Sequence, residues 1–464
     1  MRILLVAPPQ SAAYGMRISP VYPPLGLLTL AAVLQQEGHA VRVMDADAEG
    51  LDIRAAGRWA FRWKAELIGL TATTPTFPEA RRWAARLRAS ARCPVIIGGP
   101  HATALPREVL ANECFDDVVC GEAETIIGRV VERLRGDHRI PGSGFETQVR
   151  TECSKSIPDE ESLSLLPLPA WHLIRKPNRY RPPDARHLPV GTVMFSRGCP
   201  GGCKFCQSPA LFGTRVRYLS PRRAVEHAWH VQRSIGAKEI HIIDDCFTAD
   251  RAKALAILTA LKEQGPPVVY AFGNGLRADM LDDEVLDAMA ALPVHSFGLG
   301  IETADARIAS DAGKRHHLAG ISEVVDKARF RGIEVWGFFM LGLPGETAAS
   351  LESTARLARD LPLDMVKFEV FKPYPGTPLF DQLKGQGAIR ALPWSEWGIH
   401  TPPVHRHQHL GPRALWRARR RAIINLQLRP RSILRIAGTS RTMTRILLNL
   451  KAAAFVFHSL ARMW

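Results

Sequence analysis

The feature that most constrains the fold is the regular alternation of short apolar runs with helical stretches over the first 135 residues. Two of the helical stretches are clearly punctuated, because residues 25–37 end before Gly38 and residues 78–90 begin at Pro78. The strand-like runs are residues 2–7, 40–44, 67–72, 95–98 and 117–120. This pattern predicts an α/β domain over residues 1–135 that contains one doubly wound parallel sheet.

The carboxyl ends of these runs are rich in small and hydroxyl residues, which let a large ligand approach the backbone. Open α/β sheets bind their ligands at that edge. An alternative is that the segments are ordinary strand-to-helix turns. The candidate binding residues at this edge are Thr73, Thr74, Gly98, Gly99, His101, Gly121 and Glu122.

Strand and helix alternate again between residues 191 and 400, after a proline-rich and charged stretch at 136–190 that we expect to be a linker along a surface. Six strand-then-helix repeats favour a full or partial (β/α) barrel of the TIM type over a second open sheet. The expected strands are 193–196, 239–243, 269–273, 296–301, 334–341 and 365–370.

The net charge of +16 is concentrated in a C-terminal extension, residues 401–464, which contains 13 of the 61 basic residues and none of the 45 acidic ones. The basicity therefore belongs to a tail, and nucleic acid is disfavoured as a partner of the rest of the chain. Residues 414–424 and 441–464 mix Arg with apolar residues and predict amphipathic helices. Such helices suit peripheral contact with an anionic membrane, or they pack on the barrel with Arg facing solvent.

Three alternating histidines begin this tail. We expect His405, His407 and His409 to be solvated rather than to bind a metal, because the surrounding loop offers no obvious partners.

Three of the eight cysteines, Cys199, Cys203 and Cys206, crowd into a Gly- and Pro-containing loop after the first barrel strand. A structural zinc site usually needs four protein ligands, and no Cys or His pair nearby completes one. Three thiolates suit an iron-sulfur cluster that has one open iron. The low cysteine content indicates a reducing compartment, and the absence of a signal peptide and of a run of about 20 apolar residues predicts a cytoplasmic protein.

The spacing of these cysteines, with Phe205 before the last, resembles the signature of the radical S-adenosylmethionine (SAM) enzymes. The resemblance implies a 4Fe-4S cluster on the three thiolates, SAM bound to its open iron, and an electron donor such as flavodoxin or ferredoxin. Further matches to the family's cofactor contacts are Asp245, Arg277, Glu302, Gly342, Pro344 and Gly345. For the carboxylates, a salt bridge or a helix cap is the alternative.

A doubly wound domain before this barrel narrows the resemblance to the cobalamin (B12)-binding radical SAM enzymes, whose N-terminal domain is Rossmann-like. Residues 22–27, 98–103 and 121–124 look like the domain of that subgroup. The Asp-x-His-x-x-Gly motif that supplies an axial His in many cobalamin domains is absent, as is usual in the subgroup. His101 therefore either faces the corrin or bonds a loop.

The resemblance implies methylation of an unactivated carbon in a hydrophobic or natural-product-like small molecule. An alternative is a cobalamin-dependent radical cyclase or oxidative rearrangement enzyme acting on a tetrapyrrole or lipid-type substrate. A tRNA methylthiotransferase is less favoured, because Cys93, Cys114 and Cys120 do not have the spacing of a second cluster. The non-enzymatic alternative is a regulator that senses cobalamin or redox state through the same cluster loop and catalyses no reaction.

Overall fold

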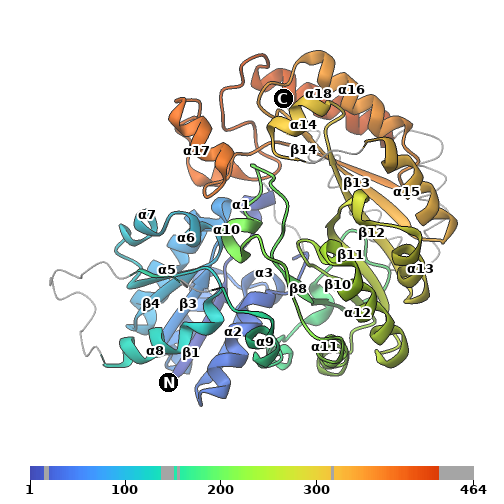
Figure 1. Ribbon diagram of the computed structural model, residues 1–464. Coiled ribbons are helices and arrows are strands. Elements are labelled where there is room, and N and C mark those ends of the chain that lie inside the picture. The colour runs from blue at the N-terminus through green and yellow to red at the C-terminus, as the bar shows by residue number, and fades with distance from the viewer. Residues whose placement is uncertain (15–19, 137–150, 154–156, 315–317, 428–464) are drawn as a thin grey trace.

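The computed structural model describes residues 1–464 except 15–19, 137–150, 154–156, 315–317 and 428–464. Figure 1 shows two regions side by side, each built on a parallel sheet, with the N-terminal sheet in blue and teal and the second in green to orange. This arrangement confirms the α/β fold class and the order of the two sheets.

The N-terminal sheet has the strand order β2-β1-β3-β4-β5-β6, and all of its neighbouring strands are parallel. Its strands are β1 (Arg2–Ala7), β2 (Ala40–Asp45), β3 (Leu67–Thr71), β4 (Val95–Gly98), β5 (Asp117–Cys120) and β6 (Thr151–Cys153). The five predicted strands are therefore confirmed. The sixth strand lies inside the stretch that the sequence assigned to a linker. It was not predicted, because a strand of three residues has too short an alternation pattern to recognise.

Helices cover both faces of this sheet, as the alternation of its side chains requires. In β1, Ile3 and Leu5 belong to the core shared with α2 and α8, whereas Leu4 and Val6 belong to the core shared with α4 and α5. The helices are α1 (Ser11–Tyr14), α2 (Leu25–Gln36), α3 (Ala46–Glu49), α4 (Ile53–Trp63), α5 (Phe77–Ala91), α6 (Pro100–Ala104), α7 (Pro106–Leu110) and α8 (Ile127–Gly136).

The second sheet has the order β14-β13-β12-β11-β10-β7, so its two end strands do not pair in the part of the chain that the structure describes. It is a partial barrel of six parallel strands: β7 (Val190–Val193), β10 (Glu239–Ile242), β11 (Val269–Leu276), β12 (Val294–Glu302), β13 (Glu334–Leu341) and β14 (Met365–Val370). The first strand lies three residues earlier than predicted. Ser196–Arg197 instead form β8, which pairs with β9 (Arg217–Tyr218) in a small antiparallel hairpin.

The two faces of the partial barrel differ in character. Phe297, Leu299 and Ile301 of β12 pack in the core formed with the flanking helices, so the alternate residues face the opposite way. We call that opposite side the inner face. The helices of this region are α10 (Ser208–Phe212), α11 (Pro221–Ile235), α12 (Arg251–Gln264), α13 (Asp283–Ala291), α14 (Ala306–Asp311), α15 (Leu318–Phe330), α16 (Ala348–Asp360), α17 (Pro378–Gly385) and α18 (Pro412–Gln427).

The described part of the connection, which contains α9 (Glu160–Leu165), is not the surface linker that the sequence predicted. Trp171 and Tyr180 are almost completely buried. The Tyr180 hydroxyl donates to Asp45 Oδ2 at 3.1 Å, and the Ala170 amide donates to the Leu28 carbonyl at 2.9 Å. Prolines keep this segment irregular, but its aromatic side chains anchor it in the core.

The C-terminal extension contains helix α18, which overlaps the predicted helix at residues 414–424 and packs on the barrel. Leu415 and Ala422 are buried, and Arg419 Nε donates to the carbonyl of Phe368 in the edge strand β14 at 2.9 Å. The apolar side of α18 is therefore used inside the protein. The second predicted amphipathic segment, residues 441–464, lies outside the described residues. No helix in the described ranges is long and apolar enough to cross a membrane.

The expectation that the three histidines of the tail are solvated is wrong for the first of them. His405 is buried, and its ring lies 5.3 Å from that of Phe371. His407 is partly buried and bonds the Leu343 carbonyl through Nε2 at 2.8 Å. Packing against the segments that follow β13 and β14, which sequence spacing does not reveal, accounts for both.

Candidate active site

The three cysteine thiols converge in the loop that follows the β8 residues. Gly201 is buried between the first two thiols, because a Cβ at this position would lie 3.2 Å from Cys199 Sγ and 3.9 Å from Cys203 Sγ. Gly198, with a φ of +100°, lets the loop pass against the backbone of Arg215. Three sulfur donors on one tight loop fit a 4Fe-4S cluster.

The environments of the thiols differ. Burial raises the pKa of Cys206 to about 11 and also raises that of Cys203. The neighbouring Cys246 thiol lowers the pKa of Cys199. Sequence reasoning missed Cys246, although it directly follows the Asp244-Asp245 pair at the end of β10.

The two aspartates after β10 differ in their hydrogen bonding. Asp244 is buried and accepts hydrogen bonds from the Phe195 and Ser196 amides, at 2.9 and 2.5 Å, so it fixes the approach to the cysteine loop. Asp245, the predicted cofactor contact, keeps a buried Oδ2 without a hydrogen-bond partner among the described residues. Burial raises the pKa of Asp245, and the Ser208 hydroxyl opposes this rise only in part. Its carboxylate is therefore available to a ligand.

Arg277 and Glu302 flank the cysteine loop. Arg277 pairs with Asp279 at 2.6 Å, and its Nη1 would lie 3.9 Å from a Cβ on Gly201. Glu302 ends β12 with a φ of +66°, which is unusual for a residue with a side chain, and it pairs with Lys314 at 3.3 Å. Both predicted residues thus stand beside the thiols, each held by a charged neighbour.

The glycine loop after β13 is bonded to the protein at Gly342 and is open to a ligand at Gly345. Gly342, with a φ of +90°, has its amide bound to the buried Glu346 carboxylate and lies against Leu415 of α18. Pro344 is partly exposed, and a Cβ on Gly345 would meet no atom within 4 Å. This backbone leaves room for a flat ligand group.

Phe205 has a packing role in the described structure. Its ring packs with Leu343 and Phe371, so it joins the cysteine loop to the ends of β13 and β14.

The carboxyl edge of the N-terminal sheet presents backbone atoms, rather than charged side chains, to a ligand. Thr73 is exposed, and Gly98 and Gly121 are partly exposed. Gly99 has a φ of +95°, and a Cβ there would lie 2.6 Å from Thr71 Oγ1, so only glycine fits this turn. This arrangement suits close approach of a large ligand.

His101 and Thr74 do not present their side chains at that edge. His101 is completely buried, its Nδ1 lies 3.3 Å from Thr74 Oγ1, and its ring is covered by Phe77 and Trp394. Burial lowers the pKa of His101 to about 4. Of the two roles that the sequence left open for His101, contact with the corrin or support of a loop, the structure favours support.

Glu122, which the sequence assigned to cofactor binding, is engaged in an ion pair between the two regions. Its buried carboxylate meets Arg197 at 2.7 Å and Arg217 at 2.5 Å. Both arginines come from the β8–β9 hairpin, and Arg197 also meets Glu124 at 2.7 Å. Glu122 therefore orients the hairpin that leads into the cysteine loop, a role that sequence position alone could not show.

These contacts bring the two carboxyl edges together. Helix α6, at the edge of the N-terminal sheet, contacts α10, which begins two residues after Cys206. A Cβ on Gly376 would lie 3.0 Å from Ala104 Cβ in α6, and Gln207 donates to the Pro375 carbonyl at 2.6 Å. One region of the molecule therefore holds the cysteine loop and the candidate cobalamin edge.

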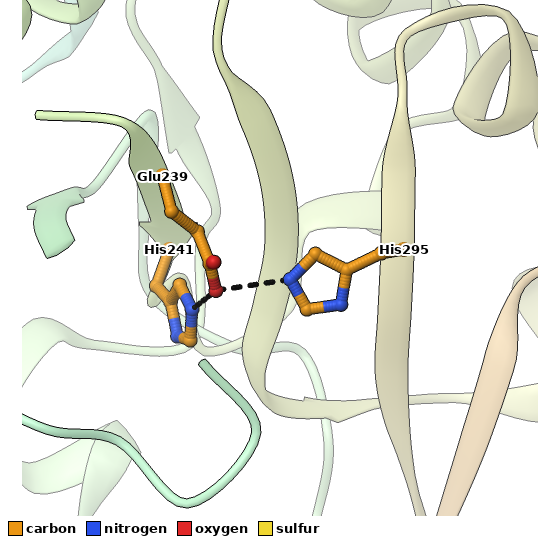
Figure 2. A group of neighbouring side chains, drawn as sticks. All are labelled: Glu239, His241 and His295. Atoms are coloured by element: carbon orange, nitrogen blue, oxygen red, sulfur yellow. Dashed lines mark hydrogen bonds and ion pairs between the residues drawn. The ribbon is translucent and has the colours of Figure 1, made fainter. Parts of the chain in front are cut away.

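A second cluster of titratable groups lies at the amino ends of β10 and β12, and sequence reasoning missed it (Figure 2). Glu239 Oε1 lies 2.6 Å from His241 Nε2 and 2.9 Å from His295 Nε2, and all three side chains are buried. These residue types can bind a metal. The distances are those of hydrogen bonds, however, and Glu239 Oε2 also accepts the amides of Arg186 and His187 at 2.7 Å each.

This cluster joins three parts of the chain. The Tyr22 hydroxyl, from the N-terminal region, lies 2.9 Å from His241 Nδ1, while the connection supplies the two amides on Glu239. We therefore interpret the cluster as a polar junction between the regions.

Comparison with known proteins agrees with this geometry. The B12 binding domain family matches residues 13–131, and the Radical SAM superfamily matches residues 193–358. The chain belongs to the cobalamin-binding radical SAM enzymes.

The relatives span most of the chain. An uncharacterized methyltransferase of Pyrococcus horikoshii is 29% identical over 440 residues, which cover 94% of each chain. An anaerobic magnesium-protoporphyrin IX monomethyl ester cyclase of Cereibacter sphaeroides is 26% identical, covering 87% of this chain and 66% of the cyclase. The cobalamin-dependent SAM radical enzyme OxsB, solved with aqua-cobalamin and SAM, shares the fold with a TM-score of 0.73 at 13% identity, covering 99% of this chain and 71% of OxsB.

Proposed function

We propose that the protein transfers a methyl group to an unactivated carbon of a small molecule. The observation that carries this proposal is the meeting of the cysteine loop with the carboxyl edge of the B12 binding domain at α6 and α10. A radical site and a methyl donor must reach the same substrate carbon, and this arrangement brings their two binding sites to one region.

The residues present fit the cofactors of this class. In it, the cluster with SAM supplies hydrogen-atom abstraction, and cobalamin supplies the methyl group. Cys199, Cys203 and Cys206 provide the thiolates for the cluster. The exposed Thr73 and the glycine backbone of β4 offer cobalamin a surface without a histidine ligand.

The groups around the thiols can orient SAM. Asp245 Oδ2, which has no hydrogen-bond partner among the described residues, can accept a hydrogen bond from an ammonium or a hydroxyl group, and the backbone at Gly345 can lie against a flat base. Glu302, half-buried and paired with Lys314, adds a fixed negative charge beside the loop. These side chains position the ligand before the chemistry begins.

The second candidate function is radical cyclisation or oxidative rearrangement. The cyclase relative favours it, since it matches 87% of this chain at 26% identity. The two functions differ in their product, because only methyl transfer adds a carbon from SAM to the substrate.

We further propose a flavodoxin or ferredoxin as the electron donor, because SAM cleavage in this class is reductive. We also propose peripheral membrane contact through residues 441–464. Helix α18 does not offer its apolar side to a membrane, because that side is buried against β14.

The test is anaerobic reconstitution of the full chain with iron, sulfide and hydroxocobalamin, followed by reduction with SAM. We expect cluster-dependent formation of 5′-deoxyadenosine and S-adenosylhomocysteine, the second product marking methyl transfer. Formation of 5′-deoxyadenosine without S-adenosylhomocysteine by the cobalamin-loaded protein would support the cyclase-type reading instead.

A further inference from the structure

The inner face of the partial barrel carries a lysine held between two aromatic rings. Lys367 of β14 is in register with Phe338 of β13. Its Nζ lies 4.9 Å from the ring centre of Trp336 and 5.1 Å from that of Phe338. Such contacts stabilise a cation, but aromatic faces accept no conventional hydrogen bond from its three N–H groups.

Two glycines determine where the Phe338 ring lies. A Cβ on Gly298 would lie 2.5 Å from this ring, and one on Gly275 would lie 3.3 Å from it. The missing side chains on β11 and β12 therefore let the ring extend across the inner face. Phe338 and Lys367 both stay partly exposed, so solvent reaches this surface.

A carboxylate follows on the same face, nearer to the cysteine loop. Glu369 is two residues beyond Lys367, is in register with Met340, and is partly exposed. Burial raises its pKa, Lys367 and Arg419 oppose the rise, and Glu302 adds to it. Because Glu302 stands beside the thiols, Glu369 lies between the lysine and the candidate radical site.

Neither charged group makes a hydrogen bond or an ion pair with another of the described residues. Lys367 contacts the Trp336 and Phe338 rings, and Glu369 interacts with Lys367, Arg419 and Glu302 only through their charges. A half-buried charge is stabilised when a charged or polar partner completes its hydrogen bonds. A substrate that enters the barrel can supply those partners.

We propose that Lys367 and Glu369 bind the polar end of the substrate. Lys367 takes an anionic group, a carboxylate or a phosphate, while Glu369 accepts a hydrogen bond from an N–H or O–H group of the same molecule. An apolar, preferably flat, part of the substrate lies on Phe338. This inference rests on the proposed function, and it narrows the substrate class from hydrophobic molecules in general to those with an acidic group.

The experiment uses the anaerobically reconstituted full chain with SAM and three probes that share one ring. These are indole-3-propionate, the corresponding alcohol 3-(indol-3-yl)propan-1-ol, and tryptamine, with dissociation constants measured by ligand-observed NMR. We expect the carboxylate to bind about ten-fold more tightly than the alcohol, as a charge-assisted hydrogen bond provides. Lys367→Met should remove this preference, and Lys367→Arg should keep it.

The matched control is Lys384→Met. Lys384 is an exposed lysine whose Nζ lies 5.7 Å from the Phe380 ring, in α17 and away from the inner face. It should leave all three dissociation constants unchanged. Equal binding of carboxylate and alcohol by the unmodified protein, or an undiminished preference in Lys367→Met, overturns the proposal. A phosphate-bearing analogue with the same ring then shows which anion Lys367 prefers.

This binding measurement separates the two proposals. If the unmodified protein forms no 5′-deoxyadenosine but prefers the carboxylate probe, the proposed reaction fails and the binding site stands. If it cleaves SAM but shows no preference that depends on Lys367, the reaction stands and the site is wrong.

Discussion

Each end of the partial barrel carries a buried carboxylate, but the two carboxylates differ in how many of their hydrogen bonds are made. At the amino end, Glu239 is completely buried, and its carboxylate accepts bonds from two histidines and two amides. At the carboxyl end, one carboxylate oxygen of Asp245 has no hydrogen-bond partner in the described part of the chain, and a Cβ on Gly345 would meet none of its atoms within 4 Å. A carboxylate with every bond made stabilises the fold, whereas one with a bond unmade is available to a ligand.

The largest expected effect is at the carboxyl end. Cys203→Ala removes one of three thiolates, so we expect loss of the reconstituted 4Fe-4S absorption and of SAM cleavage to background. Cys114→Ala, at a partly buried cysteine of the N-terminal domain, is the matched control and should retain both. Iron content and 5′-deoxyadenosine formation measure the outcome. Unimpaired cleavage by Cys203→Ala would contradict the assignment of the loop.

At the amino end we expect a change in stability rather than in chemistry. Glu239→Leu leaves two buried imidazoles and two amides without their acceptor, so the free energy of unfolding should fall by about 3 kcal/mol. Glu263→Leu, at an exposed glutamate of α12, should stay within about 0.5 kcal/mol. Urea unfolding followed by circular dichroism measures the difference. A metal that copurifies with the protein, and is lost in Glu239→Leu, would show that this end binds a cation.

The junction at Glu239 also predicts a dependence on pH. Its two histidine partners hold the pKa of Glu239 well below the usual value for a glutamate, despite its burial. A depressed carboxyl pKa contributes stability that is present above the unfolded pKa of about 4.3 and is lost as the pH falls toward the folded value. The stability difference between the unmodified protein and Glu239→Gln should therefore stay nearly constant from pH 7 down to about pH 4.3 and shrink as the pH falls further. A difference that grows on acidification would contradict this assignment.

A substitution of Glu122 distinguishes two roles for this residue at the candidate cobalamin edge: contact with the ligand, or stabilisation of the β8–β9 hairpin. Glu122→Gln removes the carboxylate that pairs with Arg217 and leaves Arg197 only Glu124, and we expect the free energy of unfolding to fall by about 2 kcal/mol. The cobalt content of the folded variant should be unchanged. Loss of cobalamin with unchanged stability would restore the cofactor-binding role that the sequence predicted.

The smallest expected effect is at the open glycine loop. Gly345→Ala introduces a Cβ at a φ of +84°, which costs about 1 kcal/mol, and it narrows the space above the backbone. We expect a rise of several-fold in the KM for SAM with little change in kcat. A fall in kcat with an unchanged KM would place this loop outside the SAM site.

The sequence predicted the order of the two sheets and the cysteine loop because both depend on local pattern. Strand alternation and the spacing of Cys199, Cys203 and Cys206 can be read within a short stretch of chain. The roles of Glu122 and His101 could not be read this way. Each depends on a partner far away in sequence, Arg217 for Glu122 and Trp394 for His101. Lys367 went unnoticed for the same reason, since its aromatic neighbours lie on the adjacent strand.

The central claim is that the cysteine loop and the B12 binding domain serve one reaction site. The most direct measurement is the electron paramagnetic resonance spectrum of the anaerobic full chain with reduced cluster and cob(II)alamin, with iron and cobalt quantified together. The account predicts about four irons and about one cobalt per chain, with spin–spin coupling between the two centres. Iron without cobalt, or two signals that do not interact, would contradict it.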